Sequence, residues 1–190
     1  MLQKTITLAV LLFVPTIIFA HGGHGDGVMA GFTHPILGVD HNVAILGSGF
    51  LGYLLHQKNW YLYPLAFIAA MVIGGFMGVN QEATFLIEKI IAFSVFSIGL
   101  LAAFRSRLNT LLVLLLLAIF GYFHGYAHGA EMPETNTVFK YIPGFTLGAI
   151  LLACIGAFIG KIAYNSNNAN TLTSLISGII IGCGIMMLLP

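Results

Sequence analysis

Apolar residues run along this chain in long stretches separated by short polar breaks. The stretches lie at about 29–55, 60–79, 83–104, 108–128, 142–164 and 171–189. A helix of about 20 residues crosses a hydrocarbon core of about 30 Å, and no stretch shows the period-two alternation of a barrel strand. The pattern therefore predicts an all-α, polytopic membrane helix bundle with six transmembrane helices.

Composition agrees with a protein that is surrounded by a lipid bilayer. Of the 190 residues, 58% are hydrophobic and only 7% are charged, which is outside the usual range for soluble domains. The few basic residues are scattered, so no basic patch indicates nucleic acid, and no Gly-rich phosphate loop indicates a nucleotide. The sequence carries no indication of oligomeric state.

The first residues have the plan of a secretory signal peptide. Lys4 precedes an apolar run at 6–19, which is too short to span a bilayer comfortably, and Ala20 is followed by polar residues. We expect residues 1–20 to be a signal peptide cleaved after Ala20, and 21–190 to form a six-helix transmembrane domain. A retained signal anchor is the alternative.

Basic residues indicate an orientation in the membrane. If the mature N-terminus lies outside, the cytoplasmic helix ends carry Lys58, Arg105, Arg107 and Lys161. Lys140 then falls in an outside loop, and Lys89 lies within the third helix. This distribution follows the positive-inside rule. It predicts a multi-pass protein of the bacterial inner membrane with a periplasmic mature N-terminus.

Glycine recurs at a spacing of four within the stretches. The spaced residues are Gly74 and Gly78, Gly121, Gly125 and Gly129, Gly144 and Gly148, Gly156 and Gly160, and Gly178 and Gly182. Small residues one turn apart let membrane helices approach closely. The pattern predicts one closely packed bundle.

Ionisable residues gather on two of the predicted helices. Such a side chain costs at least about 2.5–3.5 kcal/mol at the bilayer centre, so each one is a functional candidate. In the fourth stretch His124, His128 and Glu131 are spaced by four and three, and therefore share a helix face. Two imidazoles one turn apart, with a carboxylate on the next turn, predict a site for a divalent transition metal.

The first stretch carries the other candidate metal ligands. His34 and His41 share a face, but a straight helix would separate them by about 10 Å along its axis. Either there are two successive metal stations, or the helix is broken near Gly38, as in discontinuous transporter helices. Asp40 lies off that face in a regular helix, so it either binds the metal after a local break or orients a histidine.

Three further residues are possible accessory metal ligands. Cleavage after Ala20 would free the amine of His21, which could bind a metal together with its own imidazole and that of His24. Glu88 has two interpretations: it pairs with the neighbouring Lys89, or it lines the metal path.

These ligands suit three classes of function. They could form a permeation path for a metal ion, or an intramembrane zinc hydrolase in which histidines hold the metal and a carboxylate activates water. The hydrolase would need a polar substrate cleft, whereas Ser48, Ser94 and Ser97 are isolated. A metal sensor or accessory subunit is disfavoured because the chain shows no sizeable soluble domain. We therefore expect a transporter with no catalytic residues and no catalytic cofactor.

Two segments resemble the signatures of the HupE/UreJ family of nickel and cobalt permeases. His34, Asp40 and His41 match its first signature, a His followed after five residues by Asp-His. Phe123-His124-Gly125-Tyr126-Ala127-His128-Gly129-Ala130-Glu131 matches its second, and Glu88 to Ser94 resembles a third-span stretch of the family. The resemblance implies secondary uptake of Ni²⁺ or Co²⁺ for enzymes such as hydrogenase or urease. Imidazole and carboxylate also suit zinc, so ligand type alone does not select the ion.

Overall fold

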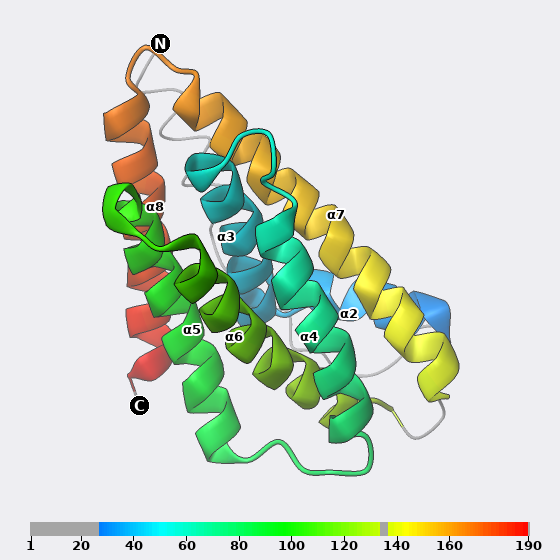
Figure 1. Ribbon diagram of the computed structural model, residues 1–190. Helices are drawn as coiled ribbons and strands as arrows, with labels where there is room; N and C mark the ends of the chain where they lie inside the picture. Colours follow the sequence, from blue (N-terminus) through cyan, green and yellow to red (C-terminus); the bar gives the residue numbers. More distant parts are fainter. Residues whose placement is uncertain (1–26, 134–136, 190) are drawn as a thin grey trace.

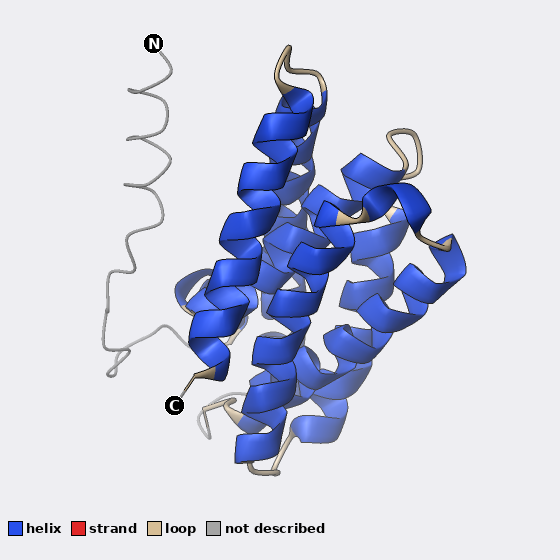
Figure 2. Ribbon diagram, turned by 90° about the vertical axis from the view of Figure 1, so that its left-hand side faces the viewer, coloured by secondary structure: helices blue, strands red, loops and turns tan. Residues whose placement is uncertain are grey.

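The computed structural model describes residues 27–133 and 137–189, and these residues are helical apart from short connections (Figures 1 and 2). The helices are α2 (Val28–Leu37), α3 (Val39–Leu55), α4 (Leu62–Gly78), α5 (Phe85–Ala103), η1 (Arg105–Arg107), α6 (Thr110–Ala130), α7 (Val138–Tyr164) and α8 (Ala169–Leu188). The all-α prediction is confirmed for this part of the chain. The predicted signal peptide, with His21 and His24 after it, lies outside the described residues.

The helices fit a multi-pass membrane protein. Four of them, α5, α6, α7 and α8, are long and apolar enough to cross a membrane. The stretch at 29–55 is divided into two helices, α2 and α3, which meet at Gly38. α3 and α4 have 17 residues each and α2 has 10. The number of six crossings stays a prediction.

Large apolar side chains cover much of the outer surface of the helices. Among the exposed ones are Ile73, Phe76, Leu111, Phe158 and Met186. Buried histidines, by contrast, lie inside the bundle. An apolar exterior around polar interior groups is the arrangement expected of helices that face lipid.

Helix α4 runs parallel to α6, and glycines set their distance. Along the contact, Gly74 and Gly78 lie against carbonyls of α6, while Gly121, Gly125 and Gly129 lie against carbonyls of α4. A methyl group on any of these glycines would overlap the facing carbonyl oxygen. The prediction that glycines spaced by four allow close helix packing is confirmed for α4 and α6, whose backbones are in direct contact.

Helix α7 runs parallel to both pieces of the interrupted segment. Gly31 and Gly144 bring α2 against the first half of α7, and Gly49 and Gly156 bring α3 against its second half (Figure 1). Because α7 is one continuous helix that contacts both α2 and α3, it packs along both sides of the break between them.

Helix α8 packs antiparallel to α5 and departs from the predicted glycine packing. Gly99 of α5 and Gly184 of α8 lie in this contact. Gly178 and Gly182, in contrast, have no neighbouring atom within 4 Å of an added Cβ. The prediction that this glycine pair packs against another helix is wrong, because it lies on the outward face of α8 among the described residues.

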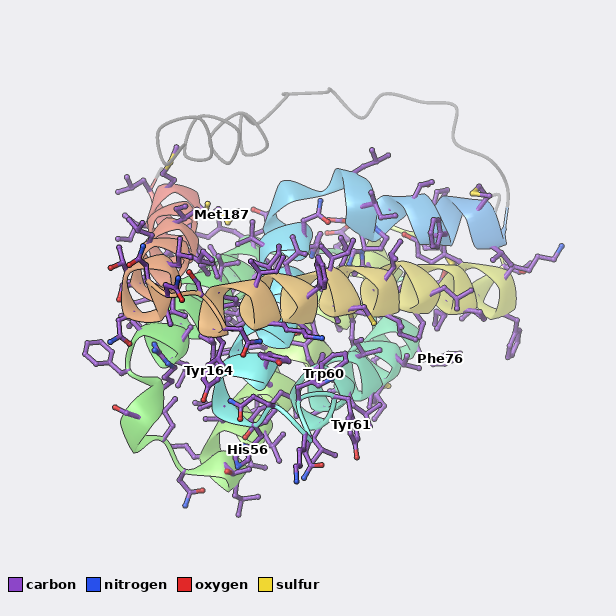
Figure 3. All side chains as sticks on the ribbon, turned by 90° about the horizontal axis from the view of Figure 1, so that it is seen from above. His56, Trp60, Tyr61, Phe76, Tyr164 and Met187 are labelled. Atoms are coloured by element: carbon purple, nitrogen blue, oxygen red, sulfur yellow. The ribbon has the colours of Figure 1, made fainter. Side chains whose placement is uncertain are left out.

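The two ends of the bundle differ in charge. Lys58, η1 with Arg105, and the last turn of α7 with Lys161 lie at the end where α3, α5 and α7 finish. The connection between α3 and α4 at this end also carries His56, Trp60 and Tyr61 (Figure 3). Lys140 lies at the opposite end, in the first turn of α7. The helix directions agree with the predicted orientation, which stays a prediction.

Candidate metal centre

The break at Gly38 brings the two histidines of the first segment close together. Gly38 has an extended backbone (φ −81°, ψ 113°), so the chain changes direction between α2 and α3. The side-chain amide of Asn42 donates to the carbonyl of Ile36, 2.6 Å away, across the break. The ring centroids of His34 and His41 are consequently 6.4 Å apart. Of the two alternatives for this segment, the broken helix is the one present.

His128 lies at the middle of the cluster. Its ring centroid is 4.8 Å from that of His34 and 4.1 Å from that of His41, and one ring face stacks on Phe145. The side chain is fully buried, and neither ring nitrogen has a hydrogen-bond partner among the described residues. Buried polar atoms nearly always have partners, so these two nitrogens are free of competing protein contacts among the described residues and are suited to bind a ligand.

Glu131 completes an outer group with two of these histidines. It caps the C-terminal end of α6, and its Oε2 lies 3.1 Å from His34 Nε2. Ligand atoms of His34, His128 and Glu131 all lie within 4.8 Å of one another. Bonds of about 2.1 Å to one ion would place such atoms about 3.4 Å apart, so small side-chain movements suffice. This group can hold a divalent transition metal.

His124 belongs to a deeper, inner group. Its Nδ1 lies 3.1 Å from Nδ1 of His41, and its Nε2 lies 2.8 Å from Oγ of Ser94 on α5. The ring also packs against Phe67 of α4 at 5.1 Å between centroids. The three residues predicted to share one face of α6 therefore have different neighbours. His128 and Glu131 lie beside His34. His124 contacts His41 and Ser94 instead.

Glu88 shares a cavity with members of both groups. A cavity of about 300 Å³ is lined by Glu88, His41 and Glu131, together with apolar residues and Met187. Lys89 does not pair with Glu88. Its ammonium instead donates to the carbonyl of Leu188 at 2.9 Å and lies over the Phe85 ring. Of the two interpretations of Glu88, the geometry favours a carboxylate that lines the cavity.

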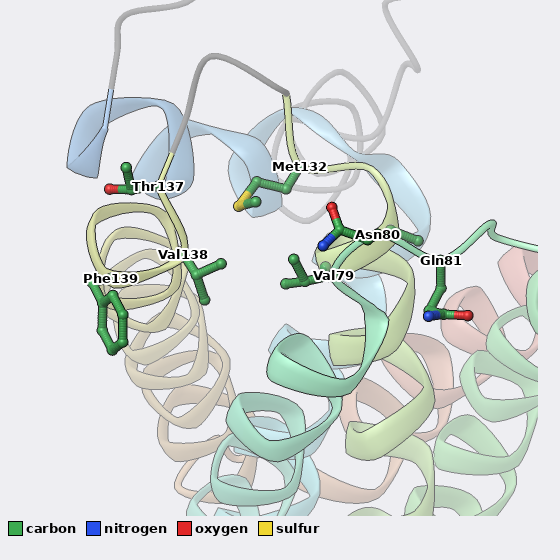
Figure 4. Close-up of a pocket in the computed structure, with 9 residues that line it drawn as sticks. Val79, Asn80, Gln81, Met132, Thr137, Val138 and Phe139 are labelled. Carbon is green, nitrogen blue, oxygen red and sulfur yellow. The ribbon is translucent and has the colours of Figure 1, made fainter.

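A larger opening lies beside Glu131. Its volume is about 670 Å³, and it is bordered by the ends of α4 and α6 and by the start of α7 (Figure 4). Ala130 and Met132, on either side of Glu131 in the sequence, line it together with Asn80, Gln81 and Thr137. Glu131 itself lines the smaller cavity, so the residues on either side of it border the larger, open one.

Two residues of this arrangement were missed from the sequence, and one predicted ligand cannot be placed. Ser94 and Asn42 hydrogen-bond to the cluster and across the helix break, respectively. A polar side chain within an apolar span needs a hydrogen-bond partner, so the sequence indicated that Ser94 and Asn42 would have partners. It did not indicate which residues those partners are. Asp40 lies in the first turn of α3, and the placement of its side chain is outside what the structure describes.

Comparisons with known proteins point in one direction. A family model described as HupE / UreJ protein matches residues 8–187. A protein of Rhizobium leguminosarum bv. viciae named Protein HupE is 34% identical over 177 residues, covering 93% of this chain and 92% of that protein. No solved structure matches. With a family match over most of its length and a relative that is 34% identical over 93% of it, this chain belongs to the HupE/UreJ family.

Proposed function

We propose that this chain is a secondary permease that carries Ni²⁺ or Co²⁺ across the bacterial inner membrane. The observation that supports this most is His128, a buried imidazole with two unsatisfied nitrogens between His34 and His41. An ion bound there would satisfy a nitrogen that now lacks a partner. Imidazole and carboxylate ligands are well suited to nickel and cobalt.

The order of the groups suggests a route for the ion. A hydrated cation would enter the cavity beside Glu131 and exchange water for Glu131 and His34. His128 contacts His34 on one side and His41 on the other, so it can pass the ion inward. Glu88 lines the cavity that also contains His41 and Glu131, and would stabilise positive charge along this step.

The driving force would be electrical. With the outer cavity on the periplasmic side, inward movement of a divalent ion through a membrane potential of 100 mV releases about 4.6 kcal/mol, twice the value for a single charge. Protons compete with metal for imidazole and carboxylate, which offers a means of release on the cytoplasmic side.

An intramembrane zinc hydrolase is the alternative function. It would need hydroxyl or other polar groups that are free to position a substrate beside the metal. The hydroxyls of Ser48, Ser94 and Ser97 all donate to carbonyls of their own helices instead. A lipid-hydrolysis assay with zinc-loaded protein discriminates between the two functions, and we expect no activity above that of zinc alone.

Metal accumulation in cells tests the permease directly. Cells producing the wild-type chain should accumulate radiolabelled nickel or cobalt, and an uncoupler should reduce the accumulation. His128→Leu should abolish it while the protein still folds, because the variant removes two unsatisfied buried nitrogens and keeps a similar volume.

The matched control is a histidine far from the cluster. His56 hydrogen-bonds to Tyr63 at the opposite end of α3, so His56→Leu should leave uptake largely unchanged. Wild-type-like uptake by His128→Leu at equal protein level would contradict the proposed function.

A further inference from the structure

A chain of hydrogen bonds runs from the backbone of α5 to the metal cluster. The hydroxyl of Ser94 lies 2.6 Å from the carbonyl oxygen of Ile91 and 2.8 Å from Nε2 of His124. Nδ1 of His124 lies 3.1 Å from Nδ1 of His41. Ser94 and His124 are fully buried, and His41 is nearly so. These contacts therefore form within the protein interior, and each constrains the next.

The direction of each hydrogen bond follows from its first member. A backbone carbonyl can only accept, so the single hydroxyl proton of Ser94 points to Ile91. The oxygen of Ser94 must then accept from His124, which places the proton of His124 on Nε2. A neutral imidazole carries one proton, so Nδ1 of His124 holds a lone pair.

The same reasoning fixes the proton on His41. Because Nδ1 of His124 accepts, the facing Nδ1 of His41 must donate. The lone pair of a neutral His41 is then on Nε2. Metal-binding histidines commonly donate their other nitrogen to a neighbouring acceptor, which fixes both tautomer and ring orientation. Here the acceptor is a second histidine that is itself fixed by a serine.

We propose that Ser94 and His124 are positioning residues that hold His41 as the Nδ1–H tautomer and thereby make Nε2 its metal-binding nitrogen. His124 acts in this role through His41 and is not itself a ligand of the ion. His41 is then set to bind next to His128, whose ring is 4.1 Å away. The consequence for metal binding rests on the proposed permease function, whereas the tautomers themselves do not.

NMR of the histidine ring nitrogens in metal-free, detergent-purified protein tests the tautomers. In the wild type we expect His124 to be protonated on Nε2 and His41 on Nδ1. Ser94→Ala should remove this preference, since Nε2–H of His124 loses its acceptor. A wild-type His124 protonated on Nδ1, or tautomers unchanged in Ser94→Ala, would overturn the proposal whether or not the protein transports metal.

Metal affinity tests the consequence. Ser94→Ala should weaken Co²⁺ binding about 10- to 100-fold, the usual effect of losing a group that orients a ligand, and should alter the absorption spectrum of bound Co²⁺. Ser94→Thr keeps the hydroxyl and should restore both. Undiminished Co²⁺ affinity in Ser94→Ala would overturn the positioning role.

The chain offers a closely matched control. Ser48 is equally buried and also donates to the carbonyl three residues earlier, that of Ile45, but it has no histidine partner in the part of the chain that the structure describes. Ser48→Ala should keep the tautomers, the affinity and the spectrum. If Ser48→Ala and Ser94→Ala weakened Co²⁺ binding equally, the effect would be one of packing, and the proposal would be wrong. A wild type that shows the expected tautomers but accumulates no metal would contradict only the proposed function.

Discussion

At the scale of single residues, the contact between His34 and Glu131 contributes little to stability. The two atoms are 3.1 Å apart, but the side chains are 30% and 44% exposed. Pairs that are open to solvent contribute only about 0–1 kcal/mol, because water screens them. In the proposed permease, the carboxylate could therefore leave His34 for an arriving ion at little cost to the fold.

Glu131→Gln tests this separation of roles. The amide keeps the size and an oxygen acceptor but loses the negative charge that attracts a divalent cation. We expect Ni²⁺ affinity to fall about 10- to 100-fold, while the free energy of unfolding changes by less than about 1 kcal/mol. Titration calorimetry and thermal unfolding in detergent measure the two quantities. Glu82→Gln, at an exposed position outside the cluster, is the control; equal losses of affinity in both variants would refute a specific role for Glu131.

The grouping of these ligands was only partly predictable from the sequence. The spacing of four and three correctly placed His128 and Glu131 on one face of α6. It also placed His124 there, yet His124 lies about 6 Å further along the helix axis and contacts His41 and Ser94 instead. Which partner a residue meets one turn deeper depends on the packing of α3 and α5, and helical periodicity carries no information about that.

At the scale of helices, the break between α2 and α3 shapes the site. The side-chain amide of Asn42 holds the carbonyl of Ile36, which the interrupted helix would otherwise leave unpaired. An unsatisfied carbonyl is costly away from water, so this hydrogen bond both stabilises the break and fixes its angle. The relative position of His34 and His41 depends on that angle.

Replacing Asn42 with Asp removes the donor and places a carboxylate oxygen against the carbonyl of Ile36. We expect a loss of about 1–3 kcal/mol in the free energy of unfolding and weaker metal binding, because the break loses its hydrogen bond. Thermal unfolding and Co²⁺ titration of the purified variant measure both effects.

The same substitution at Asn109 is the control. Asn109 is the N-cap of α6, and its side chain accepts from the amide of Leu112, as an Asp would. Asn109→Asp should be neutral or slightly stabilising. A similar loss of stability at both positions would show that the added charge, and not the helix break, is responsible.

Helix positions were more predictable than helix continuity. The stretch expected at 108–128 is α6 at Thr110–Ala130, because a long apolar run bounded by polar residues has few other solutions in lipid. The break at Gly38 could be stated only as an alternative. The apolar pattern of 29–55 is the same for one helix as for two. The break depends on a hydrogen bond from the Asn42 side chain to the carbonyl of Ile36, and hydrophobic periodicity does not reveal such a bond.

At the scale of the whole molecule, close backbone contacts hold the ligand-bearing helices in register. α6 carries His124 and His128, and its glycines lie directly against the carbonyls of α4. The interrupted segment that carries His34 and His41 is held in the same way against α7. Lipid provides little hydrophobic drive for helix association, so these contacts and their packing determine where the two halves of the site meet.

Gly125→Ala should disrupt this register. A methyl group at Gly125 would overlap the carbonyl oxygen of Met71, and the backbone of α4 would have to move away. We expect a loss of about 1–3 kcal/mol or more in the free energy of unfolding, together with weaker metal binding, because the neighbouring His124 would shift relative to His41. Thermal unfolding and Co²⁺ titration measure the two effects.

Gly178→Ala separates contact from helix propensity. Alanine favours a helix by about 1 kcal/mol over glycine, and no described residue lies within 4 Å of a methyl group added at Gly178. This variant should therefore be as stable as the wild type or more so. If Gly125→Ala were equally harmless, the backbone contact between α4 and α6 could not be what positions the histidines of α6. Their register would then have to come from side-chain packing alone.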